Sequence, residues 1–538
     1  LLPNVIVLGA VFFALGALGR RMLPVYIAGV VVLVGYLIAG RLLRDIDNRT
    51  VAALIDPLGS TALGVLTRYW SPDEKNHRIV PLANELLWNR ALWLAVGLAA
   101  FAACFVRFRL AQPGEEARPR RRKARALEAA AEASSSAPAA AARPLPLAVV
   151  RNGAADYARQ LPGLVALYVR ETVKSPYFVA IVLTGALFIL GNSRVMGAIY
   201  GTKTYPVTYQ VLEFASGTFG LFMLIVTAFY AGELVWRERD ARVAQIVDSL
   251  PAPTWLSFTG KLLTLFAMQA VLQLVVMGCG ILIQLFNGYT KLETGQYLYR
   301  LFALQLPGYW MIAVLALTIH AIVNHKYLGH FLVVLYYLVL VTASSFGFQD
   351  KLYLFGESPS IQYSDMNGYG HFVPAVRWVQ LYWAGASVLL LVIARLAWVR
   401  GTDAELRSRL KRARSRWTLA PALAAAFGLV VFLATGGWIY YNTHILNPYR
   451  DENTQEAQRA EYEKRYKPFA THPQPKVVAV RVDADLHPHS HEVRFRGQFD
   501  LRNRNAEPVT ELLVNLPEEA LVHSLTATVP LTLAESRP

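Results

Sequence analysis

The sequence predicts a mainly α fold class: a polytopic membrane bundle of about ten spans, followed by a short β-rich extracytoplasmic segment. Hydrophobic residues make up 54% of the 538 residues, and the mean hydropathy is +0.33. These residues lie in long blocks, each near the ~20 residues that an α-helix needs to cross a bilayer. The Lys and Arg residues lie beside the blocks, as the positive-inside rule describes for cytoplasmic loops. These three observations exclude an ordinary soluble protein.

The basic charge raises the alternative of a nucleic-acid-binding protein, because the formal net charge is +16. The most basic stretch, 111–146, is rich in Ala, Pro, Ser and Arg and has no aromatic residues between the charges. Such a composition cannot bury a core, so we expect 111–159 to be a flexible cytoplasmic linker and expect no nucleic-acid partner. Cys104 and Cys279 lie far apart inside apolar blocks, so neither a disulfide framework nor a metal site is expected.

Residues 1–110 are expected to contain three spans. The apolar blocks are 4–19, 23–39 and 89–106. The polar stretch 41–88 is amphipathic, and we expect short helices at the outer membrane interface there. Eight Lys and Arg residues between positions 107 and 125 follow the third span, which assigns this side to the cytoplasm.

Residues 160–400 are expected to contain an interfacial helix and six further spans. The helix is predicted over 160–175 and the spans over 176–191, 211–232, 256–286, 298–322, 327–346 and 378–398. The loops assigned to the outside, because they carry few Lys and Arg residues, are 192–210, 287–297 and 347–376. Residues 401–440 form a basic loop and one additional span, 418–440. The tail, 441–538, is then extracytoplasmic.

An internal repeat links the two parts. The stretch beginning at Leu2 aligns without a gap with the stretch beginning at Leu306. Both have two spans around a short polar turn, then a long outer loop with a Val-Pro pair, then a closing span with a basic exit. We therefore expect 1–110 to be the last three spans of one six-span half, and 160–400 to be a complete second half; the resemblance described below implies that these are permease halves. The chain would then be a fragment that lacks the first spans.

A short polar segment, 233–251, lies between two of the predicted spans. Its apolar residues have the spacing of one helix face: Val243, Ile246, Val247 and Leu250. An acidic–basic cluster precedes them: Glu238, Arg239 and Asp240. Pro251 and Pro253 prevent the helix from continuing. The pattern predicts an amphipathic helix at the membrane surface, and the alternative is a plain connecting loop.

The order of the cluster, Ile246-Val247, Leu250-Pro251 and then Lys261 at the next span resembles the coupling-helix region of ABC transporter permeases of the type-2 exporter class. In that family the helix docks into a groove on a separate ATPase subunit. The resemblance implies ATPase-coupling roles for Glu238, Arg239, Asp240, Val243, Ile246, Val247 and Leu250. It also implies an ABC ATPase partner, in two copies, which binds the ATP. GKLLT at Gly260 lacks the features of a phosphate-binding loop, and Lys261 is expected to snorkel at the end of a span.

The tail changes character. Residues 452–467 predict a charged helix. Alternating apolar residues predict three strands, 478–486, 493–501 and 510–516, with a turn at 487–490. This pattern indicates the start of an external β domain.

The stretch DLHPHSHEVRFRGQFDLRNRNAEPVTELLVNLP resembles the opening strands of the amino-terminal β domain of zinc aminopeptidases of the aminopeptidase N type. The whole chain is similar to a bacterial family in which an ABC permease is fused to such an aminopeptidase. FMLIVTAFYAGELVWRERDARVAQIVDSLPAPTW, NHKYLGHF and QYSDMNGYGHFVPAVRW are similar to its second permease half, and DPLGSTALGVLTRYW to its first. The resemblance implies that 441–538 is an external linker helix and the start of the peptidase β domain. It also implies a bacterial inner membrane location.

The chemistry of the peptidase is not expected in these residues. The family needs H-E-x-x-H on a helix to hold zinc and activate water, and no such motif occurs here. His487, His489 and His491 are read as a solvent-facing turn rather than a metal site. We therefore expect no catalytic residue and no cofactor in this chain. Zinc would belong to a peptidase domain of full-length relatives.

Three functions remain. The first is a permease subunit of an ATP-driven ABC transporter that tethers an external aminopeptidase. The second is a transport-inactive membrane anchor or scaffold for that peptidase. The third is an ion- or proton-coupled transporter, which is disfavoured because Glu213 and Glu233 lie near span ends and His320 is expected to cap a helix end. The transported substrate stays unknown. Asp365, Asn367 and His371 either line an entrance or shape a packed, Gly-rich loop.

Overall fold

The computed structural model divides the chain into two compact units, Leu1–Asn447 and Pro448–Pro538. The residues that it describes are 2–19, 24–25, 28–29, 31–32, 35–36, 49–108, 153–193, 198–199, 202–370, 372–401, 406–447, 449–490, 492–516 and 520–532. Most of the predicted span 23–39 and most of the linker 111–159 therefore lie outside the described residues.

The membrane fold class is confirmed. Within the described ranges, eight helices are long and apolar enough to cross a membrane, and a bent pair raises the number to nine if it counts as one span. The bent pair consists of α8 (Ala154–Val173) and α9 (Pro176–Asn192), which meet at 65°. The break lies at the sequence Ser175-Pro176, where proline supplies the first residue of α9. α8 corresponds to the predicted interfacial helix.

The first spans form a small group of their own. α1 (Leu2–Gly19) packs along α6 (Asn84–Arg107), and the backbone of Val7 lies 3.2 Å from where a Cβ on Gly97 would be. The expected short helices between them are α3 (Arg49–Ile55), α4 (Ser60–Leu66) and α5 (Pro72–His77). The buried Asn89 amide donates to the carbonyl oxygens of Ala53, at 2.6 Å, and Asp56, at 2.8 Å. These bonds join the polar stretch to α6.

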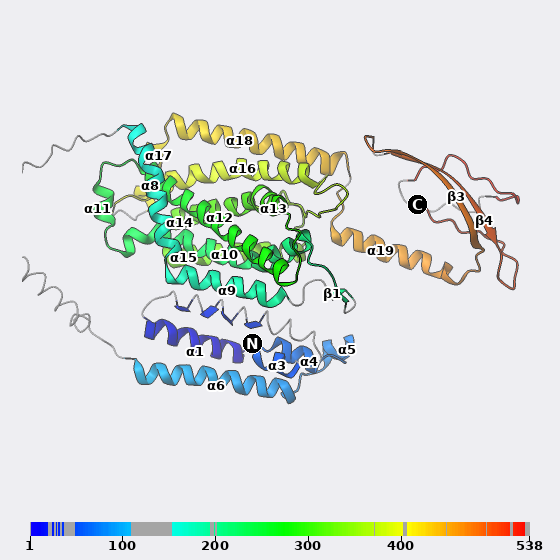
Figure 1. Cartoon of the computed structure of the whole chain (residues 1–538), viewed down its shortest axis with the longest axis horizontal. Helices are drawn as coiled ribbons and strands as arrows, with labels where there is room; N and C mark the ends of the chain where they lie inside the picture. The colour runs from blue at the N-terminus through cyan, green and yellow to red at the C-terminus, as the bar shows by residue number, and fades with distance from the viewer. Residues whose placement is uncertain are drawn as a thin grey trace, which may run out of the picture. The chain divides into compact units, whose positions relative to one another are not determined.

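Two long helices form the centre of the second group, α10 (Thr208–Asp240) and α12 (Thr254–Phe286). Around them lie α9, α14 (Leu306–Val323), α15 (Lys326–Thr342) and α16 (Phe372–Ala397). Figure 1 shows these helices running side by side along one direction. α14 is preceded by α13 (Thr294–Leu298) and a π-helical turn, η2 (Tyr299–Gln305). The core between α9, α10 and α12 includes Ile189, Phe219, Phe222, Leu265, Met268 and Leu272, all less than 2% exposed.

The additional span, α18 (Leu419–Tyr440), packs directly on α16. A Cβ on Gly385 would lie 2.7 Å from the Phe432 nitrogen and 3.0 Å from the Gly428 oxygen, so only glycine allows this contact. The ring of Tyr382 stacks on Phe432, with centroids 4.5 Å apart. At the end of α18, His444 lies 3.2 Å from Asp350 of the loop before α16. The additional span therefore belongs to the same helical group as α16.

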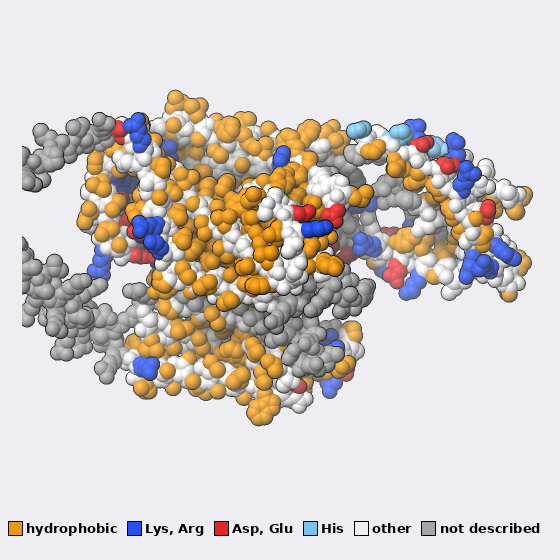
Figure 2. Space-filling model, in the orientation of Figure 1, with side chains coloured by type: hydrophobic (Ala, Val, Ile, Leu, Met, Phe, Trp, Pro, Cys, Tyr) orange, Lys and Arg blue, Asp and Glu red, His pale blue; other side chains and the backbone are white. Residues whose placement is uncertain are grey.

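The surface of the helical unit agrees with a membrane environment. Figure 2 shows hydrophobic side chains over the spans, and Lys and Arg side chains at the end that carries α8, α11 (Ala244–Ser249) and α17 (Leu406–Arg416). Large apolar side chains such as Leu187, Leu338 and Leu433 are 60% exposed or more. Exposed leucines on spans face lipid rather than water in such a protein. At the other end, β1 (Ala198–Ile199) and β2 (Thr202–Lys203) form a two-stranded antiparallel ribbon.

The second unit contains the predicted charged helix, α19 (Glu452–Tyr466), and an antiparallel hairpin of β3 (Lys476–His487) and β4 (Glu492–Arg502). The turn at 487–490 is exposed, as expected. The prediction of a third strand over 510–516 is wrong, since these residues form no strand. The oxygen of Glu511 and the amide of Leu513 bond instead to the side chain of Gln474, at 3.0 and 2.9 Å. Those two backbone groups therefore bond a side chain rather than a neighbouring strand.

Candidate functional site

The predicted coupling segment begins inside a span helix. α10 continues without a break to Asp240, so Glu233–Asp240 are its last two turns rather than part of a separate surface helix. The helix ends in a Schellman motif. The amide of Val243 donates to the Glu238 oxygen and that of Arg242 to the Arg239 oxygen, both at 3.0 Å. Arg242 occupies the left-handed position, with φ 58°, where glycine is usual.

A short helix follows, as the apolar spacing predicts. α11 covers Ala244–Ser249, and Leu250 is its C-cap residue, directly before Pro251. The four apolar residues remain on the surface: Val243 is 39% exposed, Ile246 68%, Val247 39% and Leu250 51%. We refer to these four residues as the docking face. Four exposed apolar side chains therefore lie within eight residues of one another on and beside α11.

The three charged residues of the predicted site do not share this face. Glu238 accepts a hydrogen bond from the Lys261 ammonium of α12 at 2.5 Å, and another from the Tyr168 hydroxyl of α8 at 3.2 Å. Lys261 is 2% exposed, so the expectation that it snorkels to the surface is wrong. Its charge is instead balanced inside the bundle by Glu238. This contact joins α8, α10 and α12 just before the docking face.

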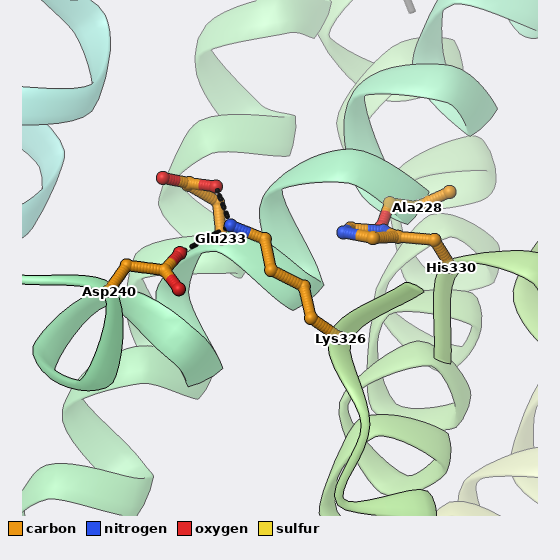
Figure 3. Close-up of polar contacts among 5 residues, drawn as sticks. All are labelled: Ala228, Glu233, Asp240, Lys326 and His330. Carbon is orange, nitrogen blue, oxygen red and sulfur yellow. Dashed lines mark hydrogen bonds and ion pairs between the residues drawn. The ribbon is translucent and has the colours of Figure 1, made fainter. Parts of the chain in front are cut away.

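Asp240 and Arg239 bond to the turn between α14 and α15. The Lys326 ammonium lies 2.5 Å from Asp240 and 2.9 Å from Glu233, as Figure 3 shows. The Arg239 guanidinium donates to the Asn324 side-chain oxygen at 2.6 Å. The sequence did not reveal Lys326 and Asn324 as partners, because they are more than eighty residues away along the chain.

One arginine from the far end of the chain holds the turn after α11. Arg400, which follows α16, donates from Nε to the Asp248 carbonyl oxygen at 3.0 Å and from Nη1 to the Ala252 oxygen at 2.7 Å. It also donates to the Leu250 oxygen. Sequence reasoning missed this role, because Arg400 is one of many basic residues between 395 and 416.

Two buried histidines lie beside this ionic group. His320 of α14 is 1% exposed, and neither ring nitrogen has a hydrogen-bond partner within the part of the chain that the structure describes, so the expectation that it caps a helix end is wrong. Its ring packs edge-on against His330 of α15, with centroids 4.8 Å apart. His330 donates from Nδ1 to the Ala228 oxygen at 3.1 Å (Figure 3). No third metal-binding residue joins them among the described residues.

The outer loop residues lie in a glycine-shaped turn. Ser364 and Gly368 exchange backbone hydrogen bonds, at 2.9 and 2.7 Å, and Gly368 and Gly370 have positive φ angles. Asp365 and Asn367 are exposed on this turn, and His371 lies outside the described residues. Within the described ranges, no group of metal-binding side chains forms at this turn.

The comparison with protein families matches part of the chain. Residues 173–342 match the model of a family described as "ABC-2 family transporter protein". The matched region runs from the end of α8 to the end of α15 and includes the docking face, Glu238–Lys261 and Lys326. No curated protein matches the chain. That family implies an ABC ATPase partner and a membrane environment. Residues 173–342 are therefore similar to the membrane domain of that family, and the match supports an ABC-2 permease.

Proposed function

We propose that this chain is the transmembrane permease subunit of an ATP-driven ABC transporter, coupled through 233–251 to a separate ATPase subunit. The observation that carries the proposal is the docking face, four apolar residues that stay exposed on a turn whose flanks are fixed by ion pairs. A plain connecting loop needs neither feature. The match of 173–342 to the ABC-2 transporter family supports the same function.

The contacts around the turn explain how a partner could drive the spans. An ATPase seated on the docking face would contact α11, which lies between α10 and α12. The buried Glu238–Lys261 pair fixes these two helices to each other, because separating the charges in a low-dielectric interior is costly. Lys326 adds α15 to the same group. A displacement of the turn therefore reaches three spans at once rather than one loop.

The proposal includes an orientation and two ATPase copies. The turn 233–255, the turn 324–326 and the basic segment 395–416 lie in the cytoplasm of a bacterial cell, because their Lys and Arg content follows the positive-inside rule. Each permease half contributes one coupling segment, so the transporter takes two ATPase subunits. The tail, 441–538, is extracytoplasmic and tethers a zinc aminopeptidase domain. The separate unit Pro448–Pro538, with its β3–β4 hairpin, supports this arrangement.

A photo-crosslinker at Ile246 tests the proposal. In the native host, the residue at this position should crosslink to a protein that mass spectrometry identifies as an ABC ATPase by its phosphate-binding loop. The control position is Tyr205, which is 80% exposed in a loop assigned to the outside, and it should capture no ATPase. The double variant Ile246→Asp/Val247→Asp should insert normally and lose ATPase co-purification about 100-fold, since burying each aliphatic side chain contributes about 1.5–3 kcal/mol.

The outcomes separate the alternatives. A double variant that holds its ATPase and transports normally would show that 233–251 is only a loop. An absence of any ATPase at Ile246, with transport also absent, would favour the transport-inactive anchor for the peptidase.

A further inference from the structure

The turn after α11, residues 248–252, receives most of its carbonyl hydrogen bonds from other parts of the chain. Pro251 and Pro253 carry no backbone N–H, so they cannot donate hydrogen bonds to the carbonyl groups at the end of α11. The carbonyl groups at the end of a helix need partners from elsewhere. Here the Asp248, Leu250 and Ala252 oxygens all accept from the Arg400 guanidinium.

A guanidinium suits this task because its five N–H groups form a rigid planar fork. Arg400 uses Nε and both terminal nitrogens on three carbonyls that alternate along the turn. The carbonyl of Pro251, in the same turn, accepts from the Tyr157 hydroxyl of α8 at 3.1 Å. The neighbouring Gly401 amide donates to the Asp248 carboxylate at 2.8 Å. Each bond comes from a different part of the chain than the turn itself.

A residue of α17 bonds to the backbone of Arg400. Arg412 donates to the Arg400 carbonyl oxygen at 2.9 Å. Arg409 donates to the Ala321 oxygen at 2.7 Å and the Ala397 oxygen at 3.1 Å, so it bridges the ends of α14 and α16. Burial lowers the pKa of the Arg409 guanidinium, and the nearby Arg239 charge lowers it further. α17 therefore connects Arg400 to the ends of two spans that do not carry the docking face.

We propose that Arg400 is the positioning residue of the docking face, fixing the turn after α11 to the end of α16. This inference rests on the proposed function, because the position of the docking face affects transport only if an ATPase binds there. Ion pairs join the end of α10, just before α11, to α12 and α15. Arg400 joins the turn after α11 to the end of α16 and, through α17, to α14. A partner bound to α11 then displaces α10, α12 and α15 together with α14 and α16.

Hydrogen exchange measures how strongly Arg400 stabilises the turn, and it needs no ATPase. The full chain is purified in detergent, and exchange is followed by mass spectrometry for the peptide 243–252. Arg400→Ala should raise its exchange rate about tenfold or more, because three charge-assisted bonds are lost. Exchange of the α16 and α14 peptides should stay unchanged, which a general loss of folding would not produce. The control is Arg395→Ala, which removes the same charge from the last turn of α16, five residues before Arg400.

A second variant keeps the test valid if the alanine variant fails to fold. Arg400→Lys retains the charge and the apolar stem, but one ammonium cannot reach three alternating carbonyls. Its exchange rate should rise about threefold. Unchanged exchange of 243–252 in the folded variants would overturn the proposal, whatever the ATPase does.

Crosslinking at Ile246 separates this proposal from the proposed function. The yield of crosslinked ATPase should fall at least about fivefold in Arg400→Ala and stay unchanged in Arg395→Ala. If exchange rises but the unaltered chain captures no ATPase at Ile246, Arg400 positions the turn and the proposed function fails. If the ATPase is captured equally well with and without Arg400, the positioning role is overturned and the proposed function stands.

Discussion

Lys261 lies two turns inside α12, and its ammonium is almost completely removed from solvent. Burying a charge in this way is tolerated only with a partner, which Glu238 supplies at 2.5 Å. The sequence places Glu238 near the end of one predicted span and Lys261 near the start of the next. It cannot show that the two side chains meet, because the contact depends on how α10 and α12 are rotated about their axes.

Removing one partner of this pair should be far more harmful than removing both. Glu238→Gln leaves an uncompensated buried ammonium and should cost about 3–5 kcal/mol. The double variant Glu238→Gln/Lys261→Met should recover most of that loss. Thermal unfolding of the detergent-solubilised chain measures both. As a control, Glu357→Gln breaks the half-exposed Lys351–Glu357 pair and should cost less than about 1 kcal/mol. Equal losses in the single and double variants would contradict a buried ion pair.

The histidine pair shows a similar limit of prediction. His320 lies in the last turn of α14, near a span end as the sequence predicts, but instead of capping a carbonyl it is buried against His330, close to two glycines. A Cβ on Gly232 would lie 2.3 Å from the His330 ring, and one on Gly329 would lie 2.3 Å from the His320 ring. No local pattern reveals this contact, because the four residues come from three helices.

Gly232→Ala should therefore destabilise the bundle by about 1–3 kcal/mol, since the surrounding rings have little room to shift. His330→Ala in the same chain should relieve the clash and restore part of the loss. The matched control is Gly220→Ala on the same helix, where a Cβ meets only the Tyr309 hydroxyl, at 3.8 Å. The comparison uses thermal unfolding midpoints. A Gly232→Ala variant as stable as the control would contradict this packing.

At the scale of elements, most helices were predictable and their ends were less so. The apolar run that ends before Glu233 predicted a span over 211–232, but α10 continues to Asp240. Polar residues can continue a helix as well as apolar ones, so hydropathy marks where the membrane ends and not where the helix ends. The Schellman motif at Arg242 ends α10 without the glycine that usually signals it. The third strand failed for a related reason, since alternation predicts a strand without supplying a partner for it.

The pairing of α16 and α18 depends on glycine at one contact. Gly428→Leu should push the helices apart, because its Cβ would lie 3.0 Å from the Gly385 oxygen and from the Val388 side chain. We expect a loss of about 2–4 kcal/mol, measured as a lower thermal unfolding midpoint. Gly437→Leu on the same helix, where the space is open, should change the midpoint little. Equal effects at both positions would show that α18 packs elsewhere.

At the scale of the whole molecule, composition and block length sufficed for the class of protein, because the thickness of a bilayer limits the lengths of spans. The Lys and Arg residues beside the apolar blocks predict which side of the membrane each loop faces, and the apolar sequence of the helices does not. The division of 1–110 and 160–400 into permease halves stays a prediction, as does the aminopeptidase character of 441–538. Arg400 lay beyond prediction, since its partners are about 150 residues away.

Labelling with a membrane-impermeant maleimide checks the orientation. The native thiols, Cys104 and Cys279, are 2% and 5% exposed and give little background. Met366→Cys, at a position 97% exposed in a loop assigned to the outside, should be labelled in intact cells. Ile246→Cys should be labelled only after the membrane is permeabilised. The reverse pattern would invert the topology and place the docking face on the wrong side for a cytoplasmic ATPase.

The continuation of α10 beyond its apolar run should carry the docking face past the edge of the bilayer. Eight residues, Glu233–Asp240, add about 12 Å along the helix axis. The headgroup layer on each side of a bilayer is only roughly 5–8 Å thick. We expect the docking face to lie in water just beyond the headgroups, on a base formed by the packed ends of α8, α10, α12 and α15. The affinity of the proposed ATPase for this face should then be the same in anionic and in neutral lipids.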